Sequence, residues 1–457
     1  MKAYFARDAL VHRGWSRDVR IVVDERGDIA EVREGASAEG AERLAGPVLP
    51  GMANLHSHAF QRAMAGLTEV RGSFHDDFWS WRELMYRFVA RLTPEHLQAI
   101  AAHLYIEMLK RGYTAVAEFH YVHNQLGGKP CAERAELLLR HLAAARQAGI
   151  AITLLPSLYA WSNFGGKPLQ PRQKRFESDV AAVLGMAEAA RRAAGGDPDV
   201  GVGASPHSLR AVDPDALRAL VDGMRALERD APIHIHAAEQ TKEVEDCVAW
   251  SGRRPVEWLL EHVPVDAHWC LVHATHASAE EIAGLARSGA VVGLCPSTEG
   301  NLGDGIFALT EYREAGGRYG IGGDSHVSRD PAEELRLLEY VQRLRHRRRN
   351  LVVTAARPAV GTTLWIEAAA GGAQALGRRM GAIASGRRAD LVVLDAEAPD
   401  LAGRSGDALA NALIFSGTAD LVRDVMVGGK WAVSERRHPE EDAAAAAFKR
   451  AAQELLA

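Results

Sequence analysis

Apolar segments rich in β-branched residues alternate with amphipathic segments along most of the chain. Eight apolar segments are predicted as strands: Val48–Ala59, Thr114–Tyr121, Ala151–Ala160, Val200–His207, Pro232–Glu239, Cys270–His276, Ala290–Pro296 and Arg318–His326. Between them, apolar residues at three- and four-residue spacing predict helices, including Pro94–Arg111, Glu133–Ala148, Pro214–Arg229 and Ala279–Ser288. This alternation predicts a parallel (β/α)8 barrel of the TIM type, with an open doubly wound sheet as the alternative.

The two ends of the chain follow a different pattern. Short runs of alternating apolar and polar residues predict strands near Val19–Val23, Ala389–Leu394 and Val422–Val433. We therefore expect residues 1–47 and 376–457 to form one small β-sandwich-like domain beside a barrel of residues 48–375. An alanine-rich terminal helix is expected at Asp442–Ala457.

Composition narrows the possible partners. The 457 residues are 47% apolar and 25% charged, with a net charge of −5, so neither nucleic acid nor an anionic membrane is expected as a partner. No apolar run approaches the ~20 residues of a membrane span, and the first residues do not resemble a signal peptide. The four cysteines lack Cys-x-x-Cys spacing, which argues against a thiolate zinc site. Cys270 and Cys295 lie in apolar runs and are expected in the core, and few scattered thiols fit a reducing cytoplasm.

Nine of the 19 histidines lie at or near the ends of predicted barrel strands. They are His56, His58, His120, His207, His234, His236, His273, His276 and His326. A single histidine is more often structural than functional. Histidines that recur at one end of a barrel are more informative, because barrel active sites form at the C-terminal ends of the strands.

Four of these strand-end residues are predicted to bind one metal ion. His56 and His58 are two residues apart on a strand, so their imidazoles point to the same face. His236 can supply a third nitrogen ligand, and Asp324, after Gly322-Gly323, can supply an oxygen. His234 lies one pleat deeper and is expected in the core.

The remaining strand-end groups suit proton transfer. Glu239 follows His236 closely enough to face an open coordination position, and His273 ends the sixth strand. With Asp324 they form the predicted catalytic set. Because no lysine lies in a predicted barrel strand to bridge two metals, we expect one ion. Zinc suits this ligand set, and iron(II), cobalt or nickel also fit.

Taken together, the motifs Leu55-His56-Ser57-His58 and His236-Ala237-Ala238-Glu239, with His273 and Asp324, resemble the deaminase branch of the amidohydrolase superfamily. Three further stretches, Leu49–Arg62, Asp77–Arg82 and Ser205–Arg210, closely resemble formimidoylglutamate deiminases of bacterial histidine degradation.

That resemblance implies a small dicarboxylate substrate. It implies substrate contacts from Gln61, Arg82, Tyr121, His207 and Arg210. The two arginines agree with the chemistry, since carboxylates favour forked cationic donors. It also implies that a metal-activated water attacks the formimino carbon, while Glu239 carries a proton to the leaving nitrogen. The products would be N-formyl-L-glutamate and ammonia.

Two alternatives stay open on the residues alone. One is another mononuclear deaminase that acts on a purine, pterin or triazine, and the other is a non-catalytic zinc-bearing barrel that serves as an interaction scaffold. A homodimer is expected only by analogy with related barrels.

Overall fold

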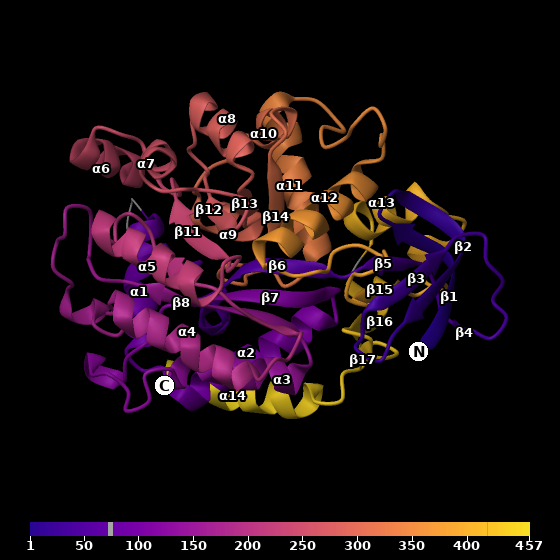
Figure 1. Cartoon of the computed structure of the whole chain (residues 1–457), viewed down its shortest axis with the longest axis horizontal. Coiled ribbons are helices and arrows are strands. Elements are labelled where there is room, and N and C mark those ends of the chain that lie inside the picture. The colour runs from indigo at the N-terminus through magenta and orange to yellow at the C-terminus, as the bar shows by residue number, and fades with distance from the viewer. Residues whose placement is uncertain (72–75, 418) are drawn as a thin grey trace.

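A computed structural model of the chain describes residues 1–71, 76–417 and 419–457, and its centre is a parallel barrel (Figure 1). Its strands are β6 (Met52–Ser57), β7 (Tyr113–His120), β8 (Ala151–Leu158), β9 (Val200–Val202) with β10 (Ser205–Pro206), β11 (Ile233–Ala237), β12 (Trp269–His273), β13 (Val291–Leu294) and β14 (Arg318–Ile321). Each lies within, or within one residue of, a predicted segment. The predicted (β/α)8 fold is confirmed.

Two curved sheets close on each other to form this barrel. One has the order β10-β8-β7-β6, with β9 also on β8, and the other has the order β11-β12-β13-β14. Parallel bridges between Ala204 and Ile233 and between Ser208 and His236 join them on one side. A parallel bridge between Ser57 and Asp324 joins β6 to the end of β14 on the other. This last bridge brings the first and eighth strand ends together.

The first predicted strand, Val48–Ala59, is two strands in two sheets. β5 (Val48–Pro50) pairs with strands of the chain ends, whereas β6 begins the barrel. Gly51 separates them, and a Cβ at this position would lie 2.2 Å from the Thr114 side chain. The chain therefore passes between the two sheets at a point where only glycine fits.

Both ends of the chain contribute to one eight-stranded sheet beside the barrel (Figure 1). Its order is β17-β16-β15-β5-β1-β2-β3, and β4 pairs with β1. The bounds are β1 (Lys2–Val11), β2 (Gly14–Val23), β3 (Ile29–Arg33), β4 (Glu42–Arg43), β15 (Leu391–Leu394), β16 (Val422–Val427) and β17 (Lys430–Val433). β5 and β15 pair in an antiparallel register, so the two ends form one sheet, as expected from their patterns.

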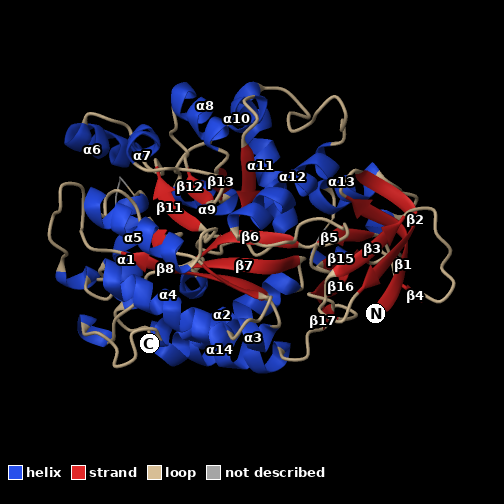
Figure 2. Ribbon diagram, in the orientation of Figure 1, coloured by secondary structure: helices blue, strands red, loops and turns tan. Residues whose placement is uncertain are grey.

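Helices surround the barrel strands (Figure 2). They are α1 (Phe78–Val89), α2 (Pro94–Leu109), α3 (Glu136–Ala148), α4 (Val180–Ala194), α5 (Pro214–Leu227), α6 (Thr241–Ser251), α7 (Pro255–His262), α8 (Ala279–Ser288), α9 (Pro296–Leu302), α10 (Leu309–Glu314), α11 (Pro331–His346), α12 (Val360–Ala375), α13 (Asp407–Phe415) and α14 (Glu441–Leu456). Many begin at a capping residue, as α5 does where Asp213 accepts a bond from the Ala216 amide ahead of Pro214.

The C-terminal helix α14 packs against the barrel rather than against the small sheet (Figure 1). Its residues Ala451 and Leu455 share a buried cluster with Leu97 of α2. An ion pair of 2.7 Å between Lys110 Nζ and Glu441 Oε2 holds its first turn. The last segment of the chain thus crosses from the sheet back over the barrel.

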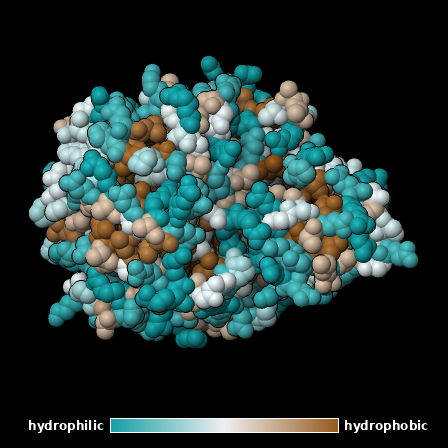
Figure 3. Space-filling model, viewed as in Figure 1, coloured by the Kyte–Doolittle hydropathy of each residue, from teal (hydrophilic) through white to brown (hydrophobic). Residues whose placement is uncertain are grey.

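Apolar residues fill the barrel and the space beneath its helices, whereas the face seen in Figure 3 is mainly hydrophilic with scattered hydrophobic patches. All four cysteines are buried and form no disulfide among the described residues, and a core position was predicted for Cys270 and Cys295. Among the described residues, no helix has both the length and the apolar character that a membrane crossing requires.

Candidate active site

The backbone places Asp324 beside the His56-Ser57-His58 segment. The Asp324 amide donates to the His56 carbonyl at 2.9 Å, and the His58 amide donates to the Asp324 carbonyl at 3.0 Å. These bonds flank the bridge between Ser57 and Asp324. Residues from opposite ends of the barrel sequence therefore present their side chains to one space.

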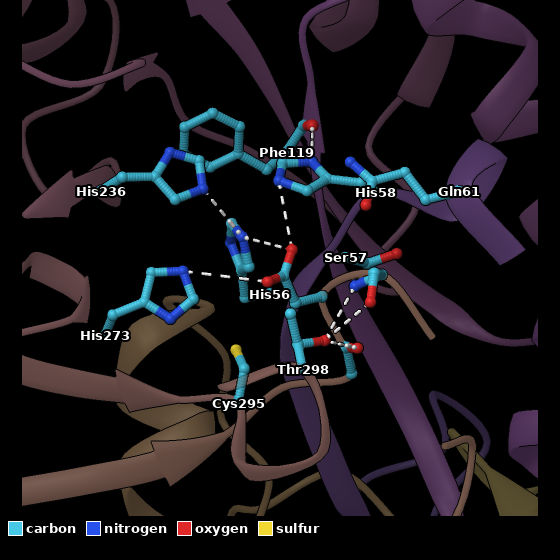
Figure 4. Close-up of polar contacts among 12 residues, drawn as sticks. His56, Ser57, His58, Gln61, Phe119, His236, His273, Cys295 and Thr298 are labelled. Atoms are coloured by element: carbon cyan, nitrogen blue, oxygen red, sulfur yellow. Dashed lines mark hydrogen bonds and ion pairs between the residues drawn. The ribbon is translucent and has the colours of Figure 1, made fainter. Parts of the chain in front are cut away.

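Four predicted ligands converge in that space. His56 Nε2 lies 3.1 Å from His236 Nε2 and 3.5 Å from Asp324 Oδ1, and His58 Nε2 lies 3.4 Å from the same oxygen. Figure 4 shows these three imidazoles, together with that of His273, directed toward one another. All of these side chains are buried.

Two of the imidazoles are held by their other nitrogen. His58 Nδ1 donates to the Phe119 carbonyl and His236 Nδ1 donates to the His207 carbonyl, each at 2.9 Å. With Nδ1 protonated, each ring presents the lone pair of Nε2 to the shared space. A backbone acceptor on the distal nitrogen is the usual support of a metal-bound histidine.

The donors fit a divalent metal ion. The ligand atoms of His56, His58 and Asp324 all lie within 4.8 Å of one another, as do those of His56, His236 and His273. Burial lowers the pKa of His56 and of His236 well below 6.5, and neighbouring histidines lower both further, so both rings are neutral at physiological pH. Neutral imidazoles that face one another at 3.1 Å, with a carboxylate alongside, suit a shared cation.

His273 and Glu239 stand next to the ligand group. His273 Nε2 lies 3.8 Å from Glu239 Oε1 and 3.8 Å from Asp324 Oδ2. Burial alone would lower the pKa of His273, but Glu239, a hydrogen bond to Glu299 and the charge of Asp324 raise it to about 10. Burial raises the pKa of Glu239 above its ordinary value, against the opposing effects of His273 and Arg210. The three predicted catalytic groups are thus adjacent.

The predicted substrate residues line one cavity above these groups. The cavity has an empty volume of about 660 Å³ and is bounded by Gln61, Arg82, Tyr121, His207 and Arg210 as well as by Glu239, His273 and Asp324. Gln61 Nε2 donates to the Tyr121 hydroxyl at 2.9 Å, while its buried Oε1 has no hydrogen-bond partner among the described residues. The structure therefore brings all the predicted site residues to one place.

The two arginines of the cavity differ in their environment. Arg210 is buried, and its Nη2 lies 3.5 Å from Glu239 Oε2. Its Nε has no hydrogen-bond partner in the part of the chain that the structure describes. Arg82 lies on α1 and stacks on Trp79 and Tyr86, with its guanidinium 4.9 and 5.4 Å from the ring centres. Burial, and then the charges of Arg210, His58 and Arg82, lower the pKa of His207, which lines the same cavity as both arginines. Two cations near one point suit a ligand with two anionic groups.

Several functional features gave no sequence motif. Aromatic residues from separate segments form the cavity wall: Phe78, Trp81, Tyr86, Tyr159 and Phe176. Three buried glutamates lie behind the site, namely Glu118, Glu243 and Glu299. The sequences around these glutamates share no pattern. The one useful observation was that Glu243 follows Glu239 by four positions.

His273, Cys295 and Glu299 form a further buried group with ligand-like atoms. Hydrogen bonds already account for it, because Glu299 Oε1 accepts from His273 Nδ1 at 3.2 Å and from the Cys295 amide at 2.9 Å. Glu299 thereby orients the His273 ring toward the cavity. His234, the strand-end histidine expected in the core, is buried and donates to the Ala375 carbonyl at 2.8 Å.

Comparisons with known proteins agree with this arrangement. Residues 48–432 match the amidohydrolase family, and residues 1–46 match the N-terminal domain of formimidoylglutamate deiminase HutF. The chain is 56% identical to the formimidoylglutamate deiminase of Pseudomonas aeruginosa, with 100% of both chains covered.

Solved structures show the same architecture. The crystal structure of an amidohydrolase from Brucella melitensis is 47% identical, with a TM-score of 0.94 and full coverage of both chains. An adenosine deaminase from Xanthomonas campestris, crystallised with bound zinc, is 23% identical, with a TM-score of 0.80 over 99% of this chain and 97% of that chain. The latter likeness concerns the fold.

Proposed function

Since the chain belongs to the amidohydrolase family, a family of hydrolases, we propose that it hydrolyses N-formimidoyl-L-glutamate to N-formyl-L-glutamate and ammonia. The main observation behind this proposal is that Arg82 and Arg210 line a cavity whose floor is formed by a group of possible metal ligands. The likeness to the Pseudomonas aeruginosa deiminase over the whole chain supports the same substrate.

We propose one zinc ion, held by His56, His58, His236 and Asp324. Three imidazole nitrogens and one carboxylate oxygen form a common catalytic zinc set that leaves a position open for water. Bound there, the ion would lower the pKa of a water molecule toward neutrality and polarise the substrate's carbon–nitrogen bond.

Side chains of the protein carry out the proton transfers. Asp324 lies on the ligand side of the cavity, where it accepts a proton from the attacking water, while the cationic His273, 3.8 Å from Asp324 Oδ2, stabilises the negative charge that develops on the water oxygen. Glu239 lies within 3.8 Å of His273 and lines the cavity, so it delivers a proton to the departing nitrogen, which leaves as ammonia. The oxygen of the water becomes the formyl oxygen of the product. General acid–base assistance of this kind contributes ~10²–10⁴-fold to a rate.

The arginines, with Gln61, Tyr121 and His207, orient the substrate. Arg82 and Arg210 bind its two carboxylates, and the unpartnered Oε1 of Gln61 accepts from a substrate N–H. Because Arg210 also faces Glu239 at 3.5 Å, a carboxylate bound by Arg210 is placed close to the proton donor.

An ammonia-release assay tests this function directly. Formimidoylglutamate, guanine, adenosine and cytosine are each incubated with metal-loaded enzyme. We expect release from formimidoylglutamate alone. Release from a nucleobase or nucleoside but not from formimidoylglutamate would assign the chain to another substrate.

A purine or related ring is the nearest alternative, and the aromatic wall of the cavity, with Tyr86, Tyr159 and Phe176, is the observation that favours it. A flat neutral ring needs stacking surfaces but no pair of cations. The comparison of Arg82→Met and Arg210→Met enzymes on both substrate classes therefore separates the two functions.

A further inference from the structure

The carboxylate of Glu243 is buried behind the cavity and bonds to the backbone that carries Glu239. Glu243 is 1% exposed. Its Oε1 accepts a hydrogen bond from the Ala238 amide at 3.2 Å, and its Oε2 accepts one from the Glu239 amide at 3.1 Å. The two carboxylate oxygens of Glu243 therefore each bind one of two consecutive backbone amides. These amides lie two and three residues after His236, a proposed metal ligand.

We propose that Glu243 is a positioning residue that sets the location of the Glu239 carboxylate through these two amides. The inference rests on the proton-transfer role of Glu239 in the proposed function. Glu243 itself does not line the cavity, so it acts through Glu239 and not on the substrate.

The segment needs such support because its backbone is strained. Ala238 has φ of 51°, in the left-handed region, which is unfavourable for a residue with a Cβ. The Ala238 carbonyl accepts from the His276 amide at 3.0 Å, which fixes the other side of the same peptide segment. Loss of the Glu243 carboxylate would free the amide side, and relaxation of φ would redirect the next residue, Glu239.

The direction of Glu239 matters because its two oxygens face different partners. Oε1 lies 3.8 Å from His273 Nε2, and Oε2 lies 3.5 Å from Arg210 Nη2. A change in the backbone moves both contacts together. Misplacement of a catalytic group by about 1 Å can lower a rate by roughly 100-fold.

Glu281 provides a matched control for a purely structural role. Glu243 and Glu281 are each the third residue of their helices, α6 and α8, and both are buried. Glu281 Oε1 accepts from the amides of Val256 and Glu257 at 3.1 and 3.0 Å. These two amides carry no proposed catalytic group. If both glutamates only cap helices and loops, their replacement should have the same effect.

The experiment compares Glu243→Gln with Glu281→Gln. Glutamine keeps one acceptor oxygen and replaces the other with an amide donor, so each variant loses at least one of the backbone hydrogen bonds that the carboxylate accepts. We expect both to unfold at lower temperature than the wild type. Only Glu243→Gln should lower kcat for formimidoylglutamate, by about 10- to 100-fold, with KM and bound zinc little changed. A kcat equal to that of Glu281→Gln, or loss of zinc from Glu243→Gln, would overturn the proposal.

A double variant tests the route through Glu239. If Glu243 acts only by placing that carboxylate, Glu239→Gln/Glu243→Gln should have the same kcat as Glu239→Gln alone. A further fall of the same size in the double variant contradicts the proposal. Wild-type turnover by Glu239→Gln would instead remove the proposed role of Glu239, so the two failures are distinct. Should Glu243→Gln not fold, Glu243→Asp, which keeps the charge on a shorter side chain, replaces it with the same expectations.

Discussion

The C-terminal ends of the barrel strands and the small sheet of the chain ends differ in where they place strain. Ten described non-glycine residues have positive φ, and five of these lie at barrel strand ends, namely Ala238, His273, Ala274, Asp324 and His326. All five are buried. In the small sheet and its turns the strained residues Asp18, Glu435 and Arg436 are exposed.

Buried polar atoms without a hydrogen-bond partner differ in a similar way. Among the described residues, the strands of the small sheet contain none and one, Asp390 Oδ2, lies directly before β15, whereas the site includes Gln61 Oε1, Arg210 Nε and His273 Nε2. Buried polar atoms are normally paired, and exceptions gather where a ligand completes the site. The comparison teaches that the small sheet keeps its strained residues at exposed positions, while the barrel rim keeps them buried beside polar groups that a metal and a substrate could satisfy.

Removal of the metal should have the largest effect on turnover, because it affects the barrel rim and not the small sheet. Enzyme treated with a chelator should lose turnover by roughly 1,000-fold or more and regain it when zinc is added back. Ammonia release and bound zinc are measured in parallel. Turnover that survives complete removal of the metal contradicts the proposed role of the ligand group.

Replacement of Glu239 by glutamine should have the next largest effect. Without a group that can carry a proton, kcat should fall by about 10²–10⁴-fold. Zinc content should not change, because Glu239 is not among the proposed ligands. Full zinc occupancy with nearly unchanged turnover would exclude Glu239 as the proton donor.

Methionine in place of Arg210 or Arg82 should act on substrate binding. We expect kcat/KM for formimidoylglutamate to fall by about 100-fold for Arg210, a loss of roughly 3 kcal/mol typical of a broken buried charge pair. Arg82 should have a smaller effect because it is partly exposed. The control is Arg349→Met, which changes an exposed arginine that follows α11. Its kcat/KM should match that of the wild type.

A side-chain truncation in the small sheet should lower stability and leave turnover unchanged. Leu391 is fully buried in β15, between β5 and β16, so Leu391→Ala should lower the free energy of unfolding by about 2–4 kcal/mol. Turnover per bound zinc should stay at the wild-type level at temperatures where the protein is folded. A large loss of kcat without unfolding would show that the sheet also shapes the active site.

Periodicity and strand-end chemistry determined much of this protein from sequence alone. The eight barrel strands, the single sheet built from both ends and the convergence of the proposed metal ligands were predictable from these patterns, whereas the proposed substrate contacts followed from the resemblance to formimidoylglutamate deiminases. The reason is physical: side chains two apart on a strand share a face, and the ends of parallel strands meet at one rim. His56, His58 and Asp324 could therefore be grouped although they lie far apart in the chain.

Tertiary structure alone decided features that depend on which segments meet. The change of sheet at Gly51 was not predicted, because Val48–Ala59 was interpreted as a single strand. The Arg210–Glu239 contact and the bonds from Glu243 to two backbone amides depend on loop conformations, including the positive φ of Ala238. Sequence periodicity reports which face a residue occupies, but not the partner that the folded chain places opposite it.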